Sequence, residues 1–442
     1  MRFVALDSWR GIAALMVAAY HFEATWHFHG APMLANSYLF VDFFFVLSGF
    51  VIAHAYGAKV NSRTDLAAFA VRRFGRLWPL AASVLAAFVA VEIVKLALVK
   101  VFGISTGAVP FDPEGYTPLR TLTSHLLLTT SLGIDQKLTW NGPDWSISAE
   151  FWTYLVFGSI TLFGGRWRLA GFTAVGLIAA ALLVTQSSHG MDATYELGFV
   201  RCVYGFMLGQ LVYALRLRLP SPLGEKVPRQ CGASLRDDGR MRGTFLNFET
   251  KPPLSLNSPL TPTLSPRGEG AMHTLLECAA VGLVIVFLST VTRGPVSYLA
   301  PFVFAIAVFI FSYEQGAVSR ILKARSLRAL GDRSYSIYMV HAFVWFVLGM
   351  TISVWQRRNA LDLWQIVSTD GGSTRMIVSP HIFALDLLFI GYLTIVLALA
   401  SVTKRWIEDP GRRYFGKIAS RISNTPETAL KRSRQNPHPE GL

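Results

Sequence analysis

The chain has 442 residues, of which 52% are hydrophobic and 15% are charged, and its formal net charge is +14. This composition is typical of membrane proteins and excludes an ordinary soluble domain. In a soluble protein the positive charge would suggest nucleic-acid binding. Here the basic residues lie mainly between apolar stretches, where they orient the chain and contact anionic lipid. We therefore expect membrane lipids, and no nucleic acid, among the partners.

Hydrophobic runs recur along the whole chain, and a membrane span needs about 20 mostly apolar residues. The first run has no small-residue cleavage site, so we interpret it as a retained helix. The sequence thus predicts an all-α polytopic membrane protein with about ten transmembrane helices. Their predicted ranges are 9–27, 37–56, 77–102, 146–163, 168–186, 196–216, 272–292, 297–313, 335–355 and 383–403.

The charges of the loops predict the orientation. The loops after the second, fourth, sixth and eighth spans hold more Lys and Arg than the loops between them, which favours both termini in the cytoplasm. The predicted membrane domain has two parts, 1–220 and 272–415. A polar, Pro-, Gly- and Ser-rich insert at 221–271 and a basic tail at 416–442 are predicted to be disordered, the insert on the cytoplasmic side.

One outer segment, Thr121–Thr130, is apolar but too short to span a bilayer. It is predicted to form a re-entrant or interfacial helix.

Two ionisable residues stand in the first span. Arg10 and His21 are eleven residues apart, so a helix places them on nearly the same face, about 16 Å apart along its axis. Ionisable side chains inside a membrane are costly and indicate function. This pair favours an elongated ligand with polar ends. In the alternative interpretation, Arg10 marks the cytoplasmic end of the helix and His21 only binds a neighbouring helix.

Two carboxylates are candidate partners for His21. Asp42, at the start of the second span, lies at a similar level and could orient the imidazole by a hydrogen bond. Glu150, in the outer half of the fourth span, is the second candidate, or a contact to substrate hydroxyls. Both could instead be interfacial residues. The nearby side chains that would suit a sugar ring are Trp145, Ser146 and Ser148.

Three arginines, Arg72, Arg73 and Arg76, lie at the predicted cytoplasmic edge of the third span, at the level of Arg10. Guanidinium groups bind phosphates in a bidentate manner, so the cluster is a candidate phosphate site. The alternative is the usual positive flank of a span.

The remaining candidates are few. Tyr335 and His341 lie in the ninth span, and His341 could be either a packing and hydrogen-bonding residue or a catalytic one. Glu23 is two residues from His21, so a continuing helix would turn it to another face, and we exclude it. The three cysteines share no metal-like spacing, and we predict no metal site and no permanently bound cofactor.

Taken together, these stretches resemble the membrane-bound acyltransferase-3 family, whose motifs occur here in the family's order. The matching segments are Leu6–His21, Val41–Phe50, Arg72–Pro79, Trp145–Glu150, Ser334–His341 and Ile407–Pro410.

The resemblance implies an enzyme of the bacterial inner membrane that transfers an acyl group from cytoplasmic acyl-CoA, most simply acetyl-CoA, to a hydroxyl of a carbohydrate or glycolipid. It implies that Arg10 and the three arginines bind the CoA phosphates, that His21 is the general base, and that Asp42 or Glu150 orients it. Because no soluble esterase-like domain follows the last span, transfer is expected to finish within the membrane domain. The residues expected to bind substrate are Trp145, Ser146, Ser148, Tyr335 and His341.

An alternative function is a transporter or exporter of a polysaccharide precursor, with His21, Asp42 and Glu150 as a proton relay. Against it, the sequence has no matching pair of Gly- or Pro-broken spans and no obvious internal repeat.

Overall fold

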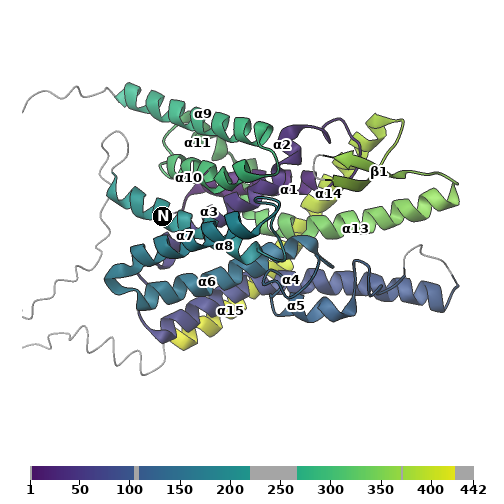
Figure 1. The fold of residues 1–442 in the computed structure, drawn as a ribbon, viewed down its shortest axis with the longest axis horizontal. Coiled ribbons are helices and arrows are strands. Elements are labelled where there is room, and N and C mark those ends of the chain that lie inside the picture. Colours follow the sequence, from purple (N-terminus) through teal and green to yellow (C-terminus); the bar gives the residue numbers. More distant parts are fainter. Residues whose placement is uncertain (1, 104–108, 220–265, 370–371, 424–442) are drawn as a thin grey trace, which may run out of the picture.

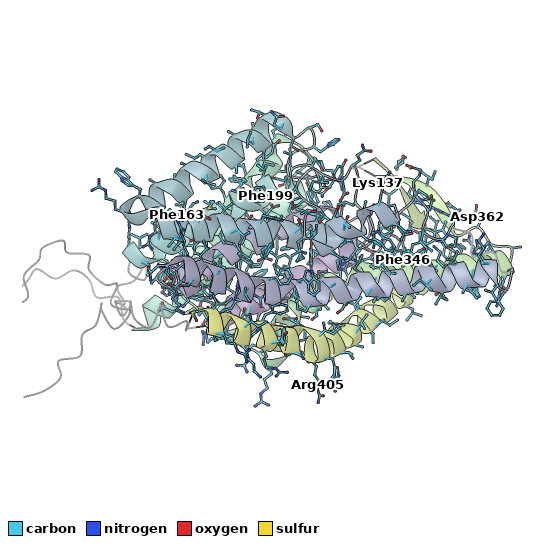
Figure 2. The ribbon with its side chains drawn as sticks, turned by 90° about the horizontal axis from the view of Figure 1, so that it is seen from below. Lys137, Phe163, Phe199, Phe346, Asp362 and Arg405 are labelled. Carbon is cyan, nitrogen blue, oxygen red and sulfur yellow. The ribbon has the colours of Figure 1, made fainter. Side chains whose placement is uncertain are left out.

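The computed structural model describes residues 2–103, 109–219, 266–369 and 372–423 as a bundle of helices with one β-hairpin. The long helices run roughly along the long axis of the molecule (Figure 1). The N-terminus and α15 lie at one end of the bundle, and the hairpin lies at the other. Phe163, which ends α6, and Asp362, in the loop before β1, likewise mark opposite ends (Figure 2).

Each of the ten predicted spans overlaps a helix of the structure. These helices are α1 (Val4–Tyr20), α3 (Phe40–Tyr56), α4 (Arg63–Lys100), α6 (Trp145–Phe163), α7 (Arg168–Gln186), α8 (Gly198–Arg218), α9 (Pro266–Thr290), α10 (Ala300–Phe311), α13 (Ser334–Arg358) and α14 (Ile382–Thr403). By length and composition, seven helices in the described part of the chain can cross a membrane. The predicted all-α polytopic membrane fold is therefore confirmed.

The shorter elements connect these helices. They are α2 (Pro32–Ala35), α5 (Leu122–Leu126), α11 (Ala317–Leu322), α12 (Arg325–Asp332), α15 (Asp409–Ser423), the strands β1 (Trp364–Thr369) and β2 (Gly372–Ile377), a π-helical turn (Lys404–Glu408), and 3-10 turns at Ser37–Leu39, Leu119–Thr121, Gly142–Asp144, Gly165–Trp167 and Pro295–Leu299. The short helix predicted at Thr121–Thr130 is only the five residues of α5.

Several predicted boundaries are wrong. Helix α4 begins at Arg63, whereas the third span was predicted to begin at 77. Helix α9 begins at Pro266, inside the predicted insert, and α15 continues to Ser423, inside the predicted tail. The rest of the insert and of the tail lies outside the described residues. Helix α1 ends at Tyr20, because the segment after it pairs with the hairpin. Ile377 donates its N–H to the Glu23 carbonyl at 2.9 Å, and its own carbonyl accepts from Thr25 N–H at 2.9 Å.

Helices α3 and α8 pack against each other at glycines. A Cβ atom at Gly49 would lie 2.0 Å from the carbonyl oxygen of Phe206, and one at Gly209 would lie 2.1 Å from that of Val46. Small residues let helix backbones approach this closely in membranes. The Gln210 side chain then donates a hydrogen bond to the Gly49 carbonyl at 2.6 Å.

We expect Gly49→Ala and Gly209→Ala to lower the melting temperature of the detergent-purified protein. The new methyl group meets a backbone carbonyl that cannot rotate away, and overpacking of this kind costs about 1–3 kcal/mol. Gly391→Ala in α14 is the matched control, since nothing lies within 4 Å of a Cβ there. Equal melting temperatures for the Gly49 and Gly391 variants would contradict the close α3–α8 contact.

Candidate active site

Two cavities lie between the helices. The first, here called the arginine cavity, has a volume of about 130 Å³ and is lined by Arg10, Arg73, Arg76, Ser48 and Glu150 among others. The second, here called the histidine cavity, has a volume of about 690 Å³, and its lining includes His21, Glu23, Asp192, Arg201 and Trp345. Val41 and Tyr338 line both cavities, so the two meet at these side chains.

Three guanidinium groups converge on the arginine cavity from α1 and α4. Arg10 Nε donates to Ser334 Oγ at 2.8 Å. Arg73 donates to the Tyr56 hydroxyl at 3.1 Å and lies over that ring. Arg76 forms an ion pair with the buried carboxylate of Glu408. Arg10 was predicted to lie at the level of the three third-span arginines. It shares a cavity with two of them, Arg73 and Arg76.

Arg72 differs from its neighbours, because it does not line the arginine cavity. Its side chain is partly exposed.

Glu150 lies in the arginine cavity and not beside His21. It accepts a hydrogen bond from Ser48 Oγ at 2.5 Å and another from the Tyr154 hydroxyl. Trp145, which begins α6, lines the histidine cavity, and five further residues of helix advance the chain by about 7.5 Å. That advance carries Glu150 to the other cavity.

His21 caps the C-terminal end of α1 and faces the histidine cavity. Its Nδ1 lies 2.9 Å from the carbonyl oxygen of Val17. A carbonyl oxygen only accepts, so Nδ1 carries the hydrogen, and Nε2 is left as the nitrogen that can accept a proton. The backbone therefore fixes the tautomer that a carboxylate was expected to fix.

His341 packs against His21. The two ring centroids are 4.9 Å apart. His341 is fully buried, and among the described residues neither of its ring nitrogens has a hydrogen-bond partner. It lines neither cavity, but it packs against His21 and Tyr338, which do.

Asp42 is paired with an arginine, and the expected Asp42–His21 hydrogen bond is absent. Its two carboxylate oxygens accept from Arg201 Nε at 2.9 Å and Nη2 at 2.7 Å. The side chains of Asp42 and Arg201 are 0% and 1% exposed. A buried charge needs a partner of opposite sign, and Arg201 provides it.

Glu23, which the sequence excluded, lines the histidine cavity with His21. The exclusion assumed a continuing helix, whereas α1 ends before this residue. Trp345 Nε1 donates to the Glu23 carboxylate at 3.3 Å.

The other predicted substrate residues are divided between the cavities. Trp145 lines the histidine cavity and lies under the Arg201 guanidinium, 5.4 Å from it. Ser146 and Tyr335 line the arginine cavity. Ser148 lines neither cavity; it is buried and donates to the Leu128 carbonyl at 2.6 Å, which attaches the preceding loop to α6.

Sequence reasoning missed Arg201 and Glu408. Arg201 was detectable, since an arginine inside an apolar span needs a carboxylate at its own depth. Glu408 accepts from Ser336 Oγ at 2.8 Å and pairs with Arg76, and it ends a π-helical turn, a feature often found at functional sites. In the described ranges, no group of three or more His, Cys, Asp and Glu side chains could hold a metal ion.

Comparison with known proteins places the chain in a family. A family model for an acyltransferase domain, of the acyltransferase-3 type, matches residues 3–400. Protein 2 in the picA locus of Rhizobium radiobacter is 34% identical over 191 residues, which cover 42% of this chain and 96% of that protein.

Two peptidoglycan O-acetyltransferases are more distant relatives. OatA of Listeria monocytogenes is 26% identical over 346 residues, covering 76% of this chain and 48% of OatA. The putative enzyme YrhL of Bacillus subtilis is 26% identical over 361 residues, covering 76% of this chain and 47% of YrhL. The chain thus spans about half the length of these two relatives.

No solved structure matches the chain. The family model, in contrast, extends over every predicted site residue, from Arg10 to His341, and over both cavities. The chain therefore belongs to the acyltransferase-3 family and is a helical, multi-pass membrane acyltransferase.

Proposed function

We propose that this enzyme is an O-acetyltransferase of the bacterial inner membrane, which moves an acetyl group from cytoplasmic acetyl-CoA to a hydroxyl of an envelope carbohydrate or glycolipid. The observation that carries the proposal is the position of His21. It is held by Val17 at the wall of a large cavity, which meets a second cavity lined by three arginines. The similarity to OatA, a peptidoglycan O-acetyltransferase, supports the reaction type.

The arginine cavity is the proposed donor site, and we place it toward the cytoplasm because the loop charges favour that side. Its volume of about 130 Å³ is smaller than a CoA molecule, so only the thioester and part of the pantetheine arm enter it. The CoA phosphates then lie at its mouth, near Arg10 and Arg73. The charge of Arg76 is already neutralised by Glu408. Arg76 therefore contributes to the donor site mainly by holding α4 in place.

The histidine cavity is the proposed acceptor site. Aromatic side chains, including Trp145, Trp345 and Trp364, provide flat apolar surfaces for a sugar ring. Glu23 is placed to accept a hydrogen bond from a second hydroxyl of the same sugar, which orients the reacting one.

The reaction needs only one proton carrier. The acceptor hydroxyl oxygen attacks the thioester carbonyl carbon while His21 Nε2 removes its proton. The tetrahedral intermediate then collapses, the C–S bond breaks, and the proton on His21 passes to the CoA thiolate. The products are an O-acetyl ester and CoA thiol, and His21 returns to its neutral form.

We expect His21→Gln to lower acetyl transfer by about 100-fold or more, the usual contribution of a general base. Membranes are incubated with radiolabelled acetyl-CoA, and base-labile acetate is counted in the envelope glycan fraction. Mass spectrometry of the same fraction then identifies the acceptor.

His29→Gln is the matched control for this variant. His29 makes the same kind of Nδ1 contact, at 2.8 Å to the Trp26 carbonyl, but it lines neither cavity. Transfer by His21→Gln at the rate of the control, at equal protein level, would refute the proposed role of His21.

We expect Arg73→Gln to raise the KM for acetyl-CoA about tenfold and to change kcat little. The variant loses one charge-assisted contact to phosphate, which is worth about 1.5–3 kcal/mol. Arg63→Gln, at the exposed start of the same helix, is the control.

The donor assignment has a second check. Acetyl-pantetheine lacks the nucleotide phosphates, so wild type and Arg73→Gln should use it with the same KM. If the variant loses affinity for acetyl-pantetheine as well, Arg73 supports the fold and does not bind phosphate.

A further inference from the structure

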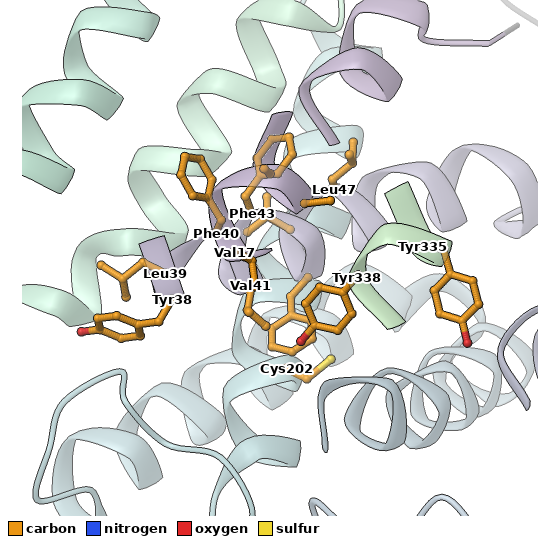
Figure 3. Close-up of a cluster of buried hydrophobic side chains, with 14 of the residues drawn as sticks. Val17, Tyr38, Leu39, Phe40, Val41, Phe43, Leu47, Cys202, Tyr335 and Tyr338 are labelled. Atoms are coloured by element: carbon orange, nitrogen blue, oxygen red, sulfur yellow. The ribbon is translucent and has the colours of Figure 1, made fainter. Parts of the chain in front are cut away.

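Tyr338 stands where the two cavities meet. It and Val41 are the two residues that line both the arginine cavity and the histidine cavity. Figure 3 shows their side chains in the centre of the buried cluster, with Tyr335, near the beginning of α13, to the right. The Tyr338 side chain therefore lies between the proposed donor cavity and the proposed acceptor cavity.

The Tyr338 hydroxyl is held in a small network. It lies 2.7 Å from Ser146 Oγ and donates to the Pro143 carbonyl at 3.1 Å. Ser146 Oγ also donates to that carbonyl, at 3.0 Å. The Pro143 carbonyl oxygen has two lone pairs and accepts from both hydroxyls, so Tyr338 can redirect its hydrogen while Ser146 keeps that carbonyl bonded.

The ring of Tyr338 is close to the proposed base. Its centroid is 5.7 Å from that of His341, which packs against His21. The ring of Phe44 also packs against the Tyr338 ring, with the two centroids 5.8 Å apart. Packing on these rings holds the tyrosine ring. Its hydroxyl bonds Ser146, which lines the arginine cavity, and Pro143, which lines the histidine cavity.

We propose that Tyr338 is a further catalytic residue, whose hydroxyl donates a hydrogen bond to the thioester carbonyl oxygen at the junction of the two cavities. This inference rests on the proposed acetyl transfer. During attack, the C=O electron pair moves onto oxygen, and the Tyr338 O–H stabilises that negative charge. The hydrogen stays on Tyr338, and the charge returns to the carbonyl when the C–S bond breaks. Ser146 keeps the Pro143 carbonyl bonded meanwhile.

The test compares two variants that remove the same hydrogen bond from opposite sides. Tyr338→Phe keeps the ring but loses the hydroxyl, and it should lower kcat for acetyl transfer about 100-fold with the KM for acetyl-CoA unchanged. Ser146→Ala loses the Ser146–Tyr338 contact but keeps the tyrosine hydroxyl, and its kcat should fall much less. Tyr204→Phe is the control, because that hydroxyl donates to the Tyr298 carbonyl and lines neither cavity.

Each outcome has a distinct meaning. A large fall in kcat for Tyr338→Phe alone supports the proposal. Equal losses for Tyr338→Phe and Ser146→Ala overturn it, because the hydrogen bond then serves only packing, and an unchanged kcat for Tyr338→Phe overturns it too. Failure of wild-type membranes to transfer acetate from acetyl-CoA would instead refute the proposed function itself. Size-exclusion profiles of the purified variants confirm that each is folded.

Discussion

The buried ion pair between Asp42 and Arg201 is the constraint on which the site depends. Neither charge is exposed, and removing one partner of such a pair costs about 3–5 kcal/mol, so the two must stay together. One residue belongs to α3 and the other to α8, which fixes the depth of each helix relative to the other. Arg201 also donates to the Tyr38 and Ala193 carbonyls. The same contact therefore positions the walls of the histidine cavity, with Trp145 packed on the guanidinium and Val41 beside the carboxylate.

The helices were largely predictable from the sequence. Hydropathy measures how apolar a segment is. Each of the ten apolar stretches that it identified overlaps a helix of the structure. The convergence of Arg10 with Arg73 and Arg76 was also predictable, since these residues share one membrane level. Depth along a helix follows from residue count alone, and that information is present in the sequence.

Side-chain partners were less predictable, because they depend on contacts between distant segments. Glu23 was excluded on the assumption of a helix that in fact ends at Tyr20, and the cause of that end is Ile377, far away in the chain. Asp42 was assigned to the histidine at its level, while a stronger partner, Arg201, stood on another helix. Glu150 was offered as a partner for His21, but it lines the arginine cavity, because neither the cavities nor their boundary can be read from hydropathy.

The hairpin joins the histidine cavity through its backbone. Ile377 pairs with the main chain of Glu23 and Thr25, while Trp364 and Arg375 face the cavity with their side chains. Main-chain hydrogen bonds do not depend on residue identity, so the attachment of the hairpin survives substitution of its side chains. In the acceptor site that we propose, this wall can thus change its side chains while His21 and its carbonyl partner stay in place.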